Sequence, residues 1–402
     1  MARLNCSPAA SKAIRIGSMC SLSYLAVYVA KNILSAASPQ MIASGAFTTE
    51  EIGTLSSLYY ICYAAGQLIN GQIGDRIKSK YMISFGLILA GLTVILIALT
   101  SSVPYAAYII YGITGVSLSM IYGPMTKTVA ENTEQPYTTR CSLGYTFSSF
   151  IGSPLAGLLA VFLLWQGVFI TCGIMLIVMG FVCFLVFSRF ERIGLIEYGK
   201  YEKNRKEGGS VKVLIQHRII KFTLIAIITG IVRTTVVFWL PTYISQHLGF
   251  SPEKAALMFT GITFCISFTT FIAIFLYERL NRNMDLTILV AFSSATCFFT
   301  LVYFVSHPVL NIVFLVLAIL SSNCAASMLW SRYCPSLRDT GMVSSATGFL
   351  DCTSYTAASI SSKLFSNAVS VIGWDNLILV WLGLMISGIA IALPHDRLRK
   401  KQ

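Results

Sequence analysis

Apolar segments of membrane length dominate this chain of 402 residues. About twelve can be distinguished, and a bilayer core of about 30 Å is crossed by about 20 apolar residues in a helix. They lie near residues 16–38, 52–71, 81–99, 105–126, 141–164, 167–187, 222–246, 254–277, 286–305, 309–331, 342–372 and 376–393. Only 11% of the residues are charged, against about 25% in soluble domains. The sequence therefore predicts an all-α membrane protein with twelve transmembrane helices.

The positive charges lie mostly on one side of these spans. Of the 29 Lys and Arg residues, 25 fall at the chain ends or in alternate loops on that side. The loops of the opposite side hold Lys254 together with Glu50, Glu51, Glu253 and Asp375. Because Lys and Arg concentrate on the cytoplasmic side, we expect a multi-pass protein of the cell membrane with both termini in the cytoplasm. The net charge of +13 then reflects topology, and we expect no nucleic-acid partner.

The sequence lacks the usual signals for bound cofactors. Eleven cysteines are scattered mostly within the spans, without a CxxC pair or metal-ligand spacing, and fit small apolar packing residues. There is also no Gly-x4-Gly-Lys-[Ser/Thr] loop that would bind a nucleotide. We therefore expect no metal, no cofactor and no enzymatic activity.

An internal repeat divides the spans into two sets of six. The longest polar stretch, at about residues 189–218, separates the two sets. Similar segments follow a proline in each half at offsets of 202 to 203 residues, Phe47–Glu50 after Pro39 and Phe250–Glu253 after Pro241. We expect two pseudo-symmetric six-helix bundles, residues 1–188 and 219–402, joined by a cytoplasmic linker.

Two cations interrupt apolar spans at equivalent places in the two halves. Lys31 and Arg233 are 202 residues apart, and each lies eight residues before a proline. A charge near the bilayer centre costs at least about 2.5 to 3.5 kcal/mol, so such residues normally face a polar cavity on a substrate or ion path. The planar fork of Arg233 can grip two oxygens of a phosphate or carboxylate. The pair predicts a two-fold binding site for an anion.

Tyrosines share helix faces with these cations. Tyr24, Tyr28 and Lys31 fall at i, i+4 and i+7, which places them on one face of the first span. Their hydroxyls can donate to anion oxygens while the ammonium supplies the charge. In the second span, Tyr59, Tyr63 and Gln67 form another polar stripe at a spacing of four. The alternative is that individual tyrosines only pack or anchor at the membrane interfaces.

Asp351 is the only acidic residue that we place inside a span, against three in-span cations, Lys31, Arg233 and Lys363. This leaves positive charge for a ligand to neutralise. Asp351 could balance one cation, accept a hydrogen bond from a hydroxyl or carry a proton. Lys363 could contact the ligand or extend to the outer membrane surface.

Several stretches together carry a family resemblance. They are Lys31 to Pro39, Gly53-x-x-x-Ser57, Tyr60-x-x-Tyr63-Ala64, Gly71-x-x-x-Asp75-Arg76, Gly86-Leu-Ile-Leu-x-Gly91, Arg233-x5-Trp239-x-Pro241-Thr242-Tyr243 and the segment from Gly348-Phe349 onward. They resemble the organophosphate:phosphate antiporter family of the major facilitator superfamily. The resemblance covers most of the chain and implies the major facilitator fold, with a site at the midplane between the halves.

The resemblance also implies residue roles. Lys31 and Arg233 correspond to the basic residues that bind the phosphoryl group, although the family usually has arginine at the first position. Lys363 is similar in position to a lysine of the hexose-phosphate branch. The glycerol-phosphate branch has a lysine where Gln67 stands and a histidine near Ser149, which argues against that branch's substrate. Tyrosines that line the family's cavity match Tyr24, Tyr28, Tyr63 and Tyr355.

The loop after the second span carries the Gly-x-x-x-Asp-Arg core of the facilitator loop motif, ending in Asp75 and Arg76. The resemblance implies a conformational latch, in which Asp75 and basic partners hold the cytoplasmic ends of helices together. This chain has Lys78 where the motif usually has glycine.

These observations predict a monomeric transporter that exchanges a small organic phosphate, such as a sugar phosphate, for inorganic phosphate by alternating access. Two alternatives remain. One is a proton-coupled transporter of another organic anion, with Asp351 titrating. The other is a transporter-like membrane sensor of a phosphorylated metabolite.

Overall fold

The computed structural model describes residues 7–74, 77–100, 103–134, 137–198, 215, 217–337 and 343–393. The chain divides into two compact units. Unit 1 comprises Met1–Asn204 and Pro252–Phe264, and unit 2 comprises Arg205–Ser251 and Cys265–Gln402. The boundaries of the predicted bundles and linker stay a prediction, because most of residues 189–218 lie outside the described residues.

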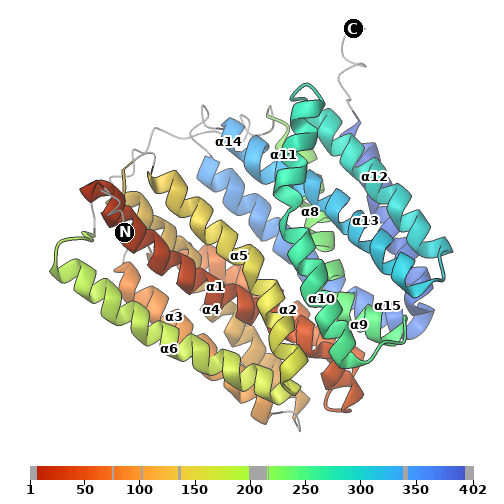
Figure 1. Cartoon of the computed structure of the whole chain (residues 1–402), viewed down its shortest axis with the longest axis horizontal. Helices are drawn as coiled ribbons and strands as arrows, with labels where there is room; N and C mark the ends of the chain where they lie inside the picture. The colour runs from red at the N-terminus through yellow and green to blue at the C-terminus, as the bar shows by residue number, and fades with distance from the viewer. Residues whose placement is uncertain are drawn as a thin grey trace, which may run out of the picture. The chain divides into compact units, whose positions relative to one another are not determined.

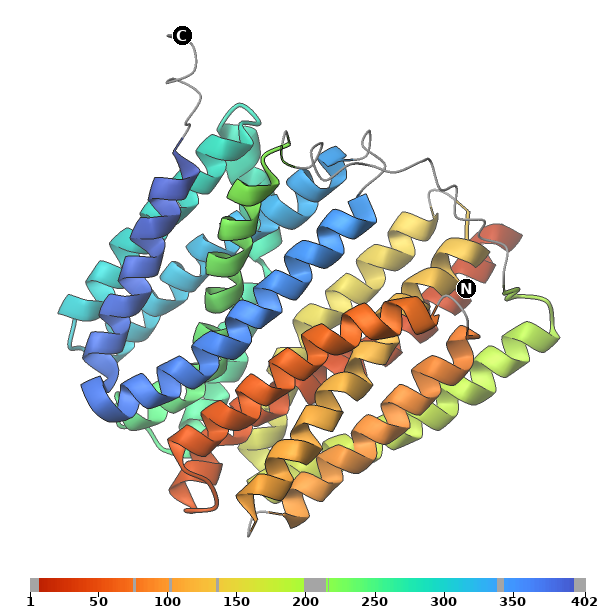
Figure 2. The ribbon, with the colours of Figure 1, turned by 180° about the vertical axis from the view of Figure 1, so that it is seen from behind.

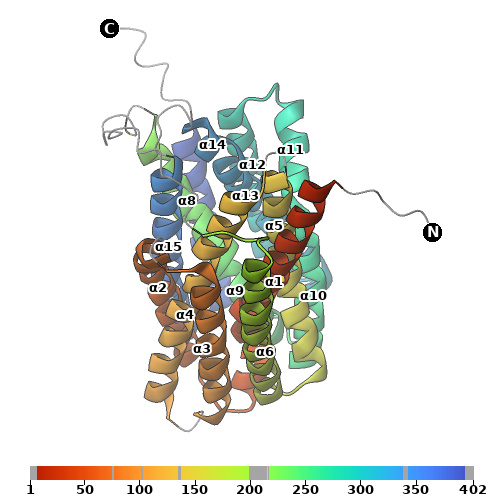
Figure 3. The same ribbon diagram turned by 90° about the vertical axis from the view of Figure 1, so that its left-hand side faces the viewer.

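Unit 1 is built from long helices that alternate in direction (Figure 1). Figure 3 shows α2, α3, α4 and α6 running along a common axis. The helices are α1 (Pro8–Ala43), α2 (Thr49–Gly74), α3 (Ser79–Leu99), α4 (Pro104–Asn132), α5 (Tyr137–Phe162) and α6 (Trp165–Arg192), together with most of α10 (Pro252–Ser267).

Unit 2 contains helices that are interrupted by two π-helical segments, η1 and η2. One continuous span comprises α8 (Ile219–Gly230), η1 (Ile231–Val236) and α9 (Val237–Gln246). The others are α11 (Thr269–Arg279), α12 (Met284–Phe304), α13 (Pro308–Met328), η2 (Leu329–Tyr333), α14 (Cys334–Ser336) and α15 (Val343–Ala392). Figure 2 shows the two arms of α15, which meet at a sharp turn.

The predicted number of membrane helices is confirmed. Nine helices of the described residues are long and apolar enough to cross a membrane. One of them, Ala346–Ala392, holds two spans, because Gly373 leaves the helical region with φ 76° and ψ 174°. The helices α2 and α5, of 26 residues each, complete the twelve. The described residues form no strand, so the all-α prediction is also confirmed.

Local sequence signals fix where the first helices begin. Pro8 opens α1, and the Ser7 hydroxyl accepts a hydrogen bond from the backbone N–H of Ala10 at 3.2 Å. Before α2, Thr48 and Glu51 form a reciprocal capping box, in which the Glu51 carboxylate accepts from Thr48 N at 2.7 Å and Thr48 Oγ1 accepts from Glu51 N at 3.2 Å. These caps satisfy donors that a helix start would otherwise leave unpaired.

Small residues bring the helices of unit 1 close together where the candidate site lies. A Cβ atom at Gly115 of α4 would lie 2.5 Å from the carbonyl oxygen of Tyr59 on α2. A Cβ atom at Gly152 of α5 would collide with Tyr28 on α1. Membrane helices lack a hydrophobic driving force toward one another, so such close backbone approach provides much of their packing energy. It also fixes the neighbouring tyrosines in place.

Candidate functional site

Lys31 lies among aromatic rings of unit 1. Its ammonium nitrogen is 5.4 Å from the ring centroid of Tyr28 and 4.7 Å from that of Tyr63. Lys31 and Tyr28 are half-buried, whereas Tyr63 is buried with 3% exposure. The structure thus brings together three of the predicted site residues, from α1 and α2. Gln67 is half-buried one turn beyond Tyr63 on α2.

Three further tyrosines, one each from α1, α4 and α5, extend this group. The ring centroid of Tyr24 is 4.9 Å from that of Tyr28, 5.4 Å from that of Tyr122 on α4 and 6.0 Å from that of Tyr145 on α5. The rings of Tyr122 and Tyr145 are 6.2 Å apart. Tyr24 and Tyr145 are buried, but Tyr122 keeps 41% exposure. We call the five tyrosines of this group the tyrosine cluster: Tyr24, Tyr28, Tyr63, Tyr122 and Tyr145.

Sequence analysis missed Tyr122 and Tyr145. Neither shares a helix with an in-span cation, so no local spacing marks them. Tyr111 and Tyr122 of α4 are eleven residues apart, about three helical turns, which places them on one face. Tyr111 packs on Tyr59 of α2 with 5.2 Å between ring centroids. The sequence therefore indicated only weakly which face of α4 packs against the other helices of the unit.

Arg233 lies on η1 in unit 2. Its guanidinium carbon is 5.7 Å from the ring centroid of Trp330 on η2, and both residues are half-buried. The π-helical turn adds a residue to the helix, and such turns often occur at functional sites. Sequence analysis gave no role to Trp330, which lies 97 residues away along the chain.

The first arm of α15 packs directly on η1. Thr235 Oγ1 donates to the carbonyl oxygen of Ala358 at 3.1 Å and lies 2.8 Å from Ser361 Oγ. A Cβ atom at Gly230, just before η1, would collide with Ser354. The same arm carries three predicted site residues, of which Tyr355 is buried while Asp351 and Lys363 are half-buried. Arg233 and these three residues therefore come from adjacent elements of unit 2. A single site shared by Lys31 and Arg233 stays a prediction.

The predicted latch residues Asp75 and Arg76 lie outside the described residues. The described part of that loop forms a different cluster, in which Glu191 at the end of α6 accepts from the ammonium groups of Lys78 and Lys80. The carboxylate raises the pKa of Lys78 by hydrogen bonding and by its charge. Lys78 also lies 5.7 Å from the ring of Tyr198, whose pKa is raised to about 12, first by burial and then by the charge of Glu191.

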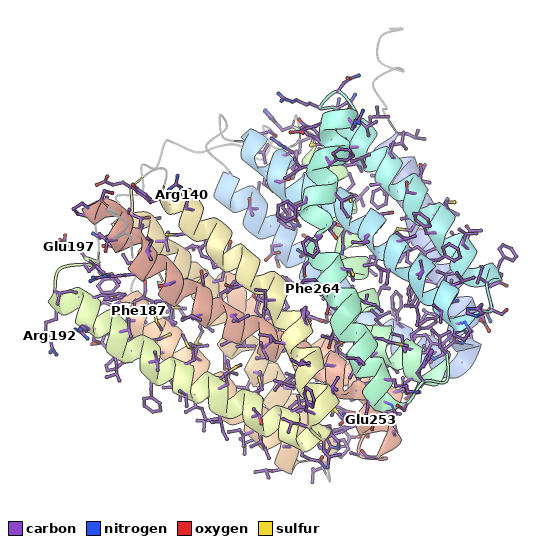
Figure 4. All side chains as sticks on the ribbon, in the orientation of Figure 1. Arg140, Phe187, Arg192, Glu197, Glu253 and Phe264 are labelled. Carbon is purple, nitrogen blue, oxygen red and sulfur yellow. The ribbon has the colours of Figure 1, made fainter. Side chains whose placement is uncertain are left out.

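Figure 4 labels three charged residues at this end of unit 1: Arg192 at the end of α6, Glu197 beyond that helix and Arg140 near the start of α5. Glu253 lies at the opposite end of the unit, where α10 begins. The assignment of these ends to the two sides of a membrane stays a prediction. Among the described residues no group of three or more His, Cys, Asp or Glu side chains could hold a metal ion.

The apolar helices of membrane length that the described residues form define a polytopic membrane protein. Residues 20–362 match the Major Facilitator Superfamily, and the chain belongs to that superfamily. It is 23% identical to the membrane sensor protein UhpC of Escherichia coli (strain K12) over 403 residues, 89% of this chain and 86% of that one. It is 26% identical to the glycerol-3-phosphate transporter of Bacillus subtilis (strain 168) over 258 residues, and the match spans 58% of that transporter.

These relatives confirm the resemblance to the organophosphate:phosphate antiporter family. Among solved structures, a bacterial homolog of the human lysosomal transporter Spinster, inward-facing and unoccupied, matches with a TM-score of 0.76 and 12% identity. The match covers 96% of this chain and 97% of that one, and supports the fold alone.

Proposed function

We propose that this protein is a secondary transporter that exchanges an organic phosphate of the sugar-phosphate class for inorganic phosphate by alternating access. The observation that carries the proposal is the placement of Lys31 and Arg233. Each lies within a membrane span, is half-buried and has an aromatic ring of its own unit within 6 Å. A cation held by aromatic faces keeps its charge for a ligand.

The chemistry of the surrounding side chains suits a phosphoryl group. Arg233 can form two parallel hydrogen bonds to phosphate oxygens, and Lys31 supplies a point charge. The hydroxyls of the tyrosine cluster can donate to further oxygens or to the hydroxyls of a sugar. Aromatic rings also offer faces to the apolar side of a sugar ring. The relatives named above include a transporter of a phosphorylated three-carbon compound, which supports the same ligand class.

Exchange of like anions is favourable on physical grounds. Moving one negative charge into a cell against a potential of 100 mV costs about 2.3 kcal/mol. A returning anion of equal charge cancels this cost, so the membrane potential neither drives nor opposes the exchange. We place the chain in the cell membrane with both termini in the cytoplasm, on the side that carries most Lys and Arg residues.

Counterflow in reconstituted vesicles tests the proposal. Vesicles loaded with unlabelled inorganic phosphate should accumulate labelled phosphate, and externally added sugar phosphate should release it. The same uptake is measured with and without an imposed proton gradient. Exchange that needs the proton gradient would favour the proton-coupled alternative with Asp351 as the titrating group. A folded protein that neither exchanges phosphate nor responds to the gradient would refute transport of this class.

A second candidate, a membrane sensor, is favoured by the long match to UhpC, which spans 89% of this chain. A sensor would bind the same ligand class without sustained flux. Tight binding of a sugar phosphate in detergent, together with no counterflow in vesicles, would support the sensor. Counterflow at the rate expected for a carrier would exclude a purely sensory role.

A further inference from the structure

The described residues contain two π-helical segments, and both lie in unit 2. One carries Arg233 and the other carries Trp330, and these two side chains contact each other. A proline follows each segment, Pro241 and Pro335, and proline cannot donate the N–H bond that continues an α-helix. Two rare local distortions therefore accompany one cation–π contact.

The neighbours of Trp330 on η2 pack against another helix. Leu329 has 0% exposure and Tyr333 has 3%, and the ring of Tyr333 stacks on Phe222 of α8 at 3.6 Å between centroids. These residues pack the span against its neighbour. Trp330 is only half-buried, and its ring centroid lies 5.7 Å from the guanidinium carbon of Arg233.

We propose that Trp330 is a positioning residue that orients the guanidinium of Arg233 for an incoming phosphoryl group. This inference rests on the proposed function. A carboxylate in the same place would orient the cation but would also compete with the anionic ligand. An aromatic face attracts the cation through its quadrupole, and this contact uses none of the N–H donors in the plane of the fork.

Unit 1 shows the same arrangement independently. Lys31 also lies over aromatic rings, those of Tyr28 and Tyr63. Each unit thus contains an in-span cation, Lys31 or Arg233, within 6 Å of an aromatic ring centroid. Arginine has several rotatable bonds, so fixing its head group before binding lowers the entropy that the ligand must otherwise offset.

Kinetic measurement of phosphate self-exchange tests this role. Trp330→Leu keeps an apolar side chain but removes the ring. It should raise the KM for inorganic phosphate about tenfold, which corresponds to about 1.4 kcal/mol and lies between the values for exposed and for desolvated cation–π contacts. The kcat should change much less. Trp330→Phe keeps a ring face and should raise KM less than the leucine variant does. The matched control is Tyr277→Leu, which removes the ring 4.7 Å from Arg332 and should leave KM unchanged.

Intrinsic fluorescence gives a readout that a purely structural role would not change. Inorganic phosphate added to the wild-type protein in detergent should change its tryptophan emission, because the ligand alters the charge beside Trp330. Trp330→Phe should lose this response, while Trp374→Phe, in the same unit, should keep it. A wild-type KM in Trp330→Leu, or a full response in Trp330→Phe, would overturn the inference.

The two proposals fail separately. If wild-type vesicles show no exchange but the phosphate response still depends on Trp330, transport fails and the positioning role stands. If exchange is normal and neither variant differs from the wild type, the positioning role fails and transport stands. Should Trp330→Leu fail to fold, Trp330→Phe and its fluorescence decide the question.

Discussion

Two in-span cations of this protein, Lys31 and Arg233, lie against aromatic rings, and an aromatic partner matters for the proposed binding of an anion. A carboxylate paired with the cation inside the protein would hold it strongly, but an incoming anion would have to displace that carboxylate. The ring contacts of Lys31 with Tyr63 at 4.7 Å and of Arg233 with Trp330 at 5.7 Å involve no such displacement. The residue chemistry thus favours reversible binding, as exchange requires.

Arg233→Lys should lower phosphate exchange at least about thirtyfold, because losing one charge-assisted hydrogen bond costs about 2 kcal/mol. An ammonium cannot reproduce the two-pronged contact of the guanidinium. Lys31→Arg should be milder, since arginine retains the charge and adds donors. The control is Arg332→Lys, which changes an exposed arginine that also lies over an aromatic ring. Wild-type exchange by Arg233→Lys at equal membrane abundance would remove Arg233 from the site.

Lys363→Ala should change substrate preference and spare phosphate self-exchange. Lys363 has no counterpart at the equivalent place of the first half, whereas Lys31 and Arg233 repeat and are the proposed phosphoryl-binding residues. Its ammonium would meet a second anionic or hydroxyl-rich end of the ligand. Competition by several sugar phosphates against labelled phosphate measures the effect. An unchanged competition profile would favour a side chain that only extends to the outer membrane surface.

At the scale of helices, each unit contains one carboxylate that forms ion pairs with two cations near helix ends. Glu191 accepts from Lys78 and Lys80 in unit 1. In unit 2, Asp285 accepts from Arg218 at 3.0 Å and from Lys221 at 3.1 Å. Exposed ion pairs contribute only about 0 to 1 kcal/mol each. Close packing between helices must therefore provide most of the stability, and glycines provide the closest approaches.

Gly115→Ala should lower the melting temperature of the protein in detergent. Alanine favours a helix over glycine by about 1 kcal/mol, but overpacking a close contact costs about 1 to 3 kcal/mol. The new methyl group would lie 2.5 Å from the Tyr59 carbonyl and 3.2 Å from the Tyr63 amide nitrogen, and backbone cannot rotate away as a side chain can. The matched control is Gly123→Ala on the same helix, where no atom lies within 4 Å. A higher melting temperature for both variants would show that α2 and α4 separate easily.

The sequence was sufficient to predict the spans, because bilayer thickness imposes a length and a composition on every helix. The break between spans at residues 372 and 376 reappears at Gly373. The π-helical segments were not predictable in the same way, since no rule of length or composition marks the residue that a π-helical turn adds. Trp330 was missed because its contact with Arg233 depends on packing between distant segments. Tyr24, Tyr28 and Lys31 were found because their spacing on one helix is local.

At the scale of the whole molecule, the central question is whether net charge moves during one transport cycle. Membership in the Major Facilitator Superfamily fixes the fold but leaves the coupling open. The described spans contain few acidic side chains, with Asp351 half-buried on α15. Carriers that move a net charge are driven or opposed by the membrane potential, whereas an exchange of like anions is not. Electrical measurement therefore separates the candidate mechanisms without knowledge of the exact substrate.

Phosphate self-exchange should be insensitive to membrane potential. Moving one net charge through 100 mV is worth about 2.3 kcal/mol, which changes an equilibrium about fiftyfold. Vesicles carrying a potassium gradient are treated with valinomycin to set potentials of either sign, and labelled phosphate accumulation is followed to its final level. We expect final levels within twofold of each other at all potentials, because each anion that enters is balanced by one that leaves. Accumulation that follows the potential would indicate uniport or charged symport and would contradict exchange. Vesicles that contain no internal phosphate serve as the control and should accumulate almost none.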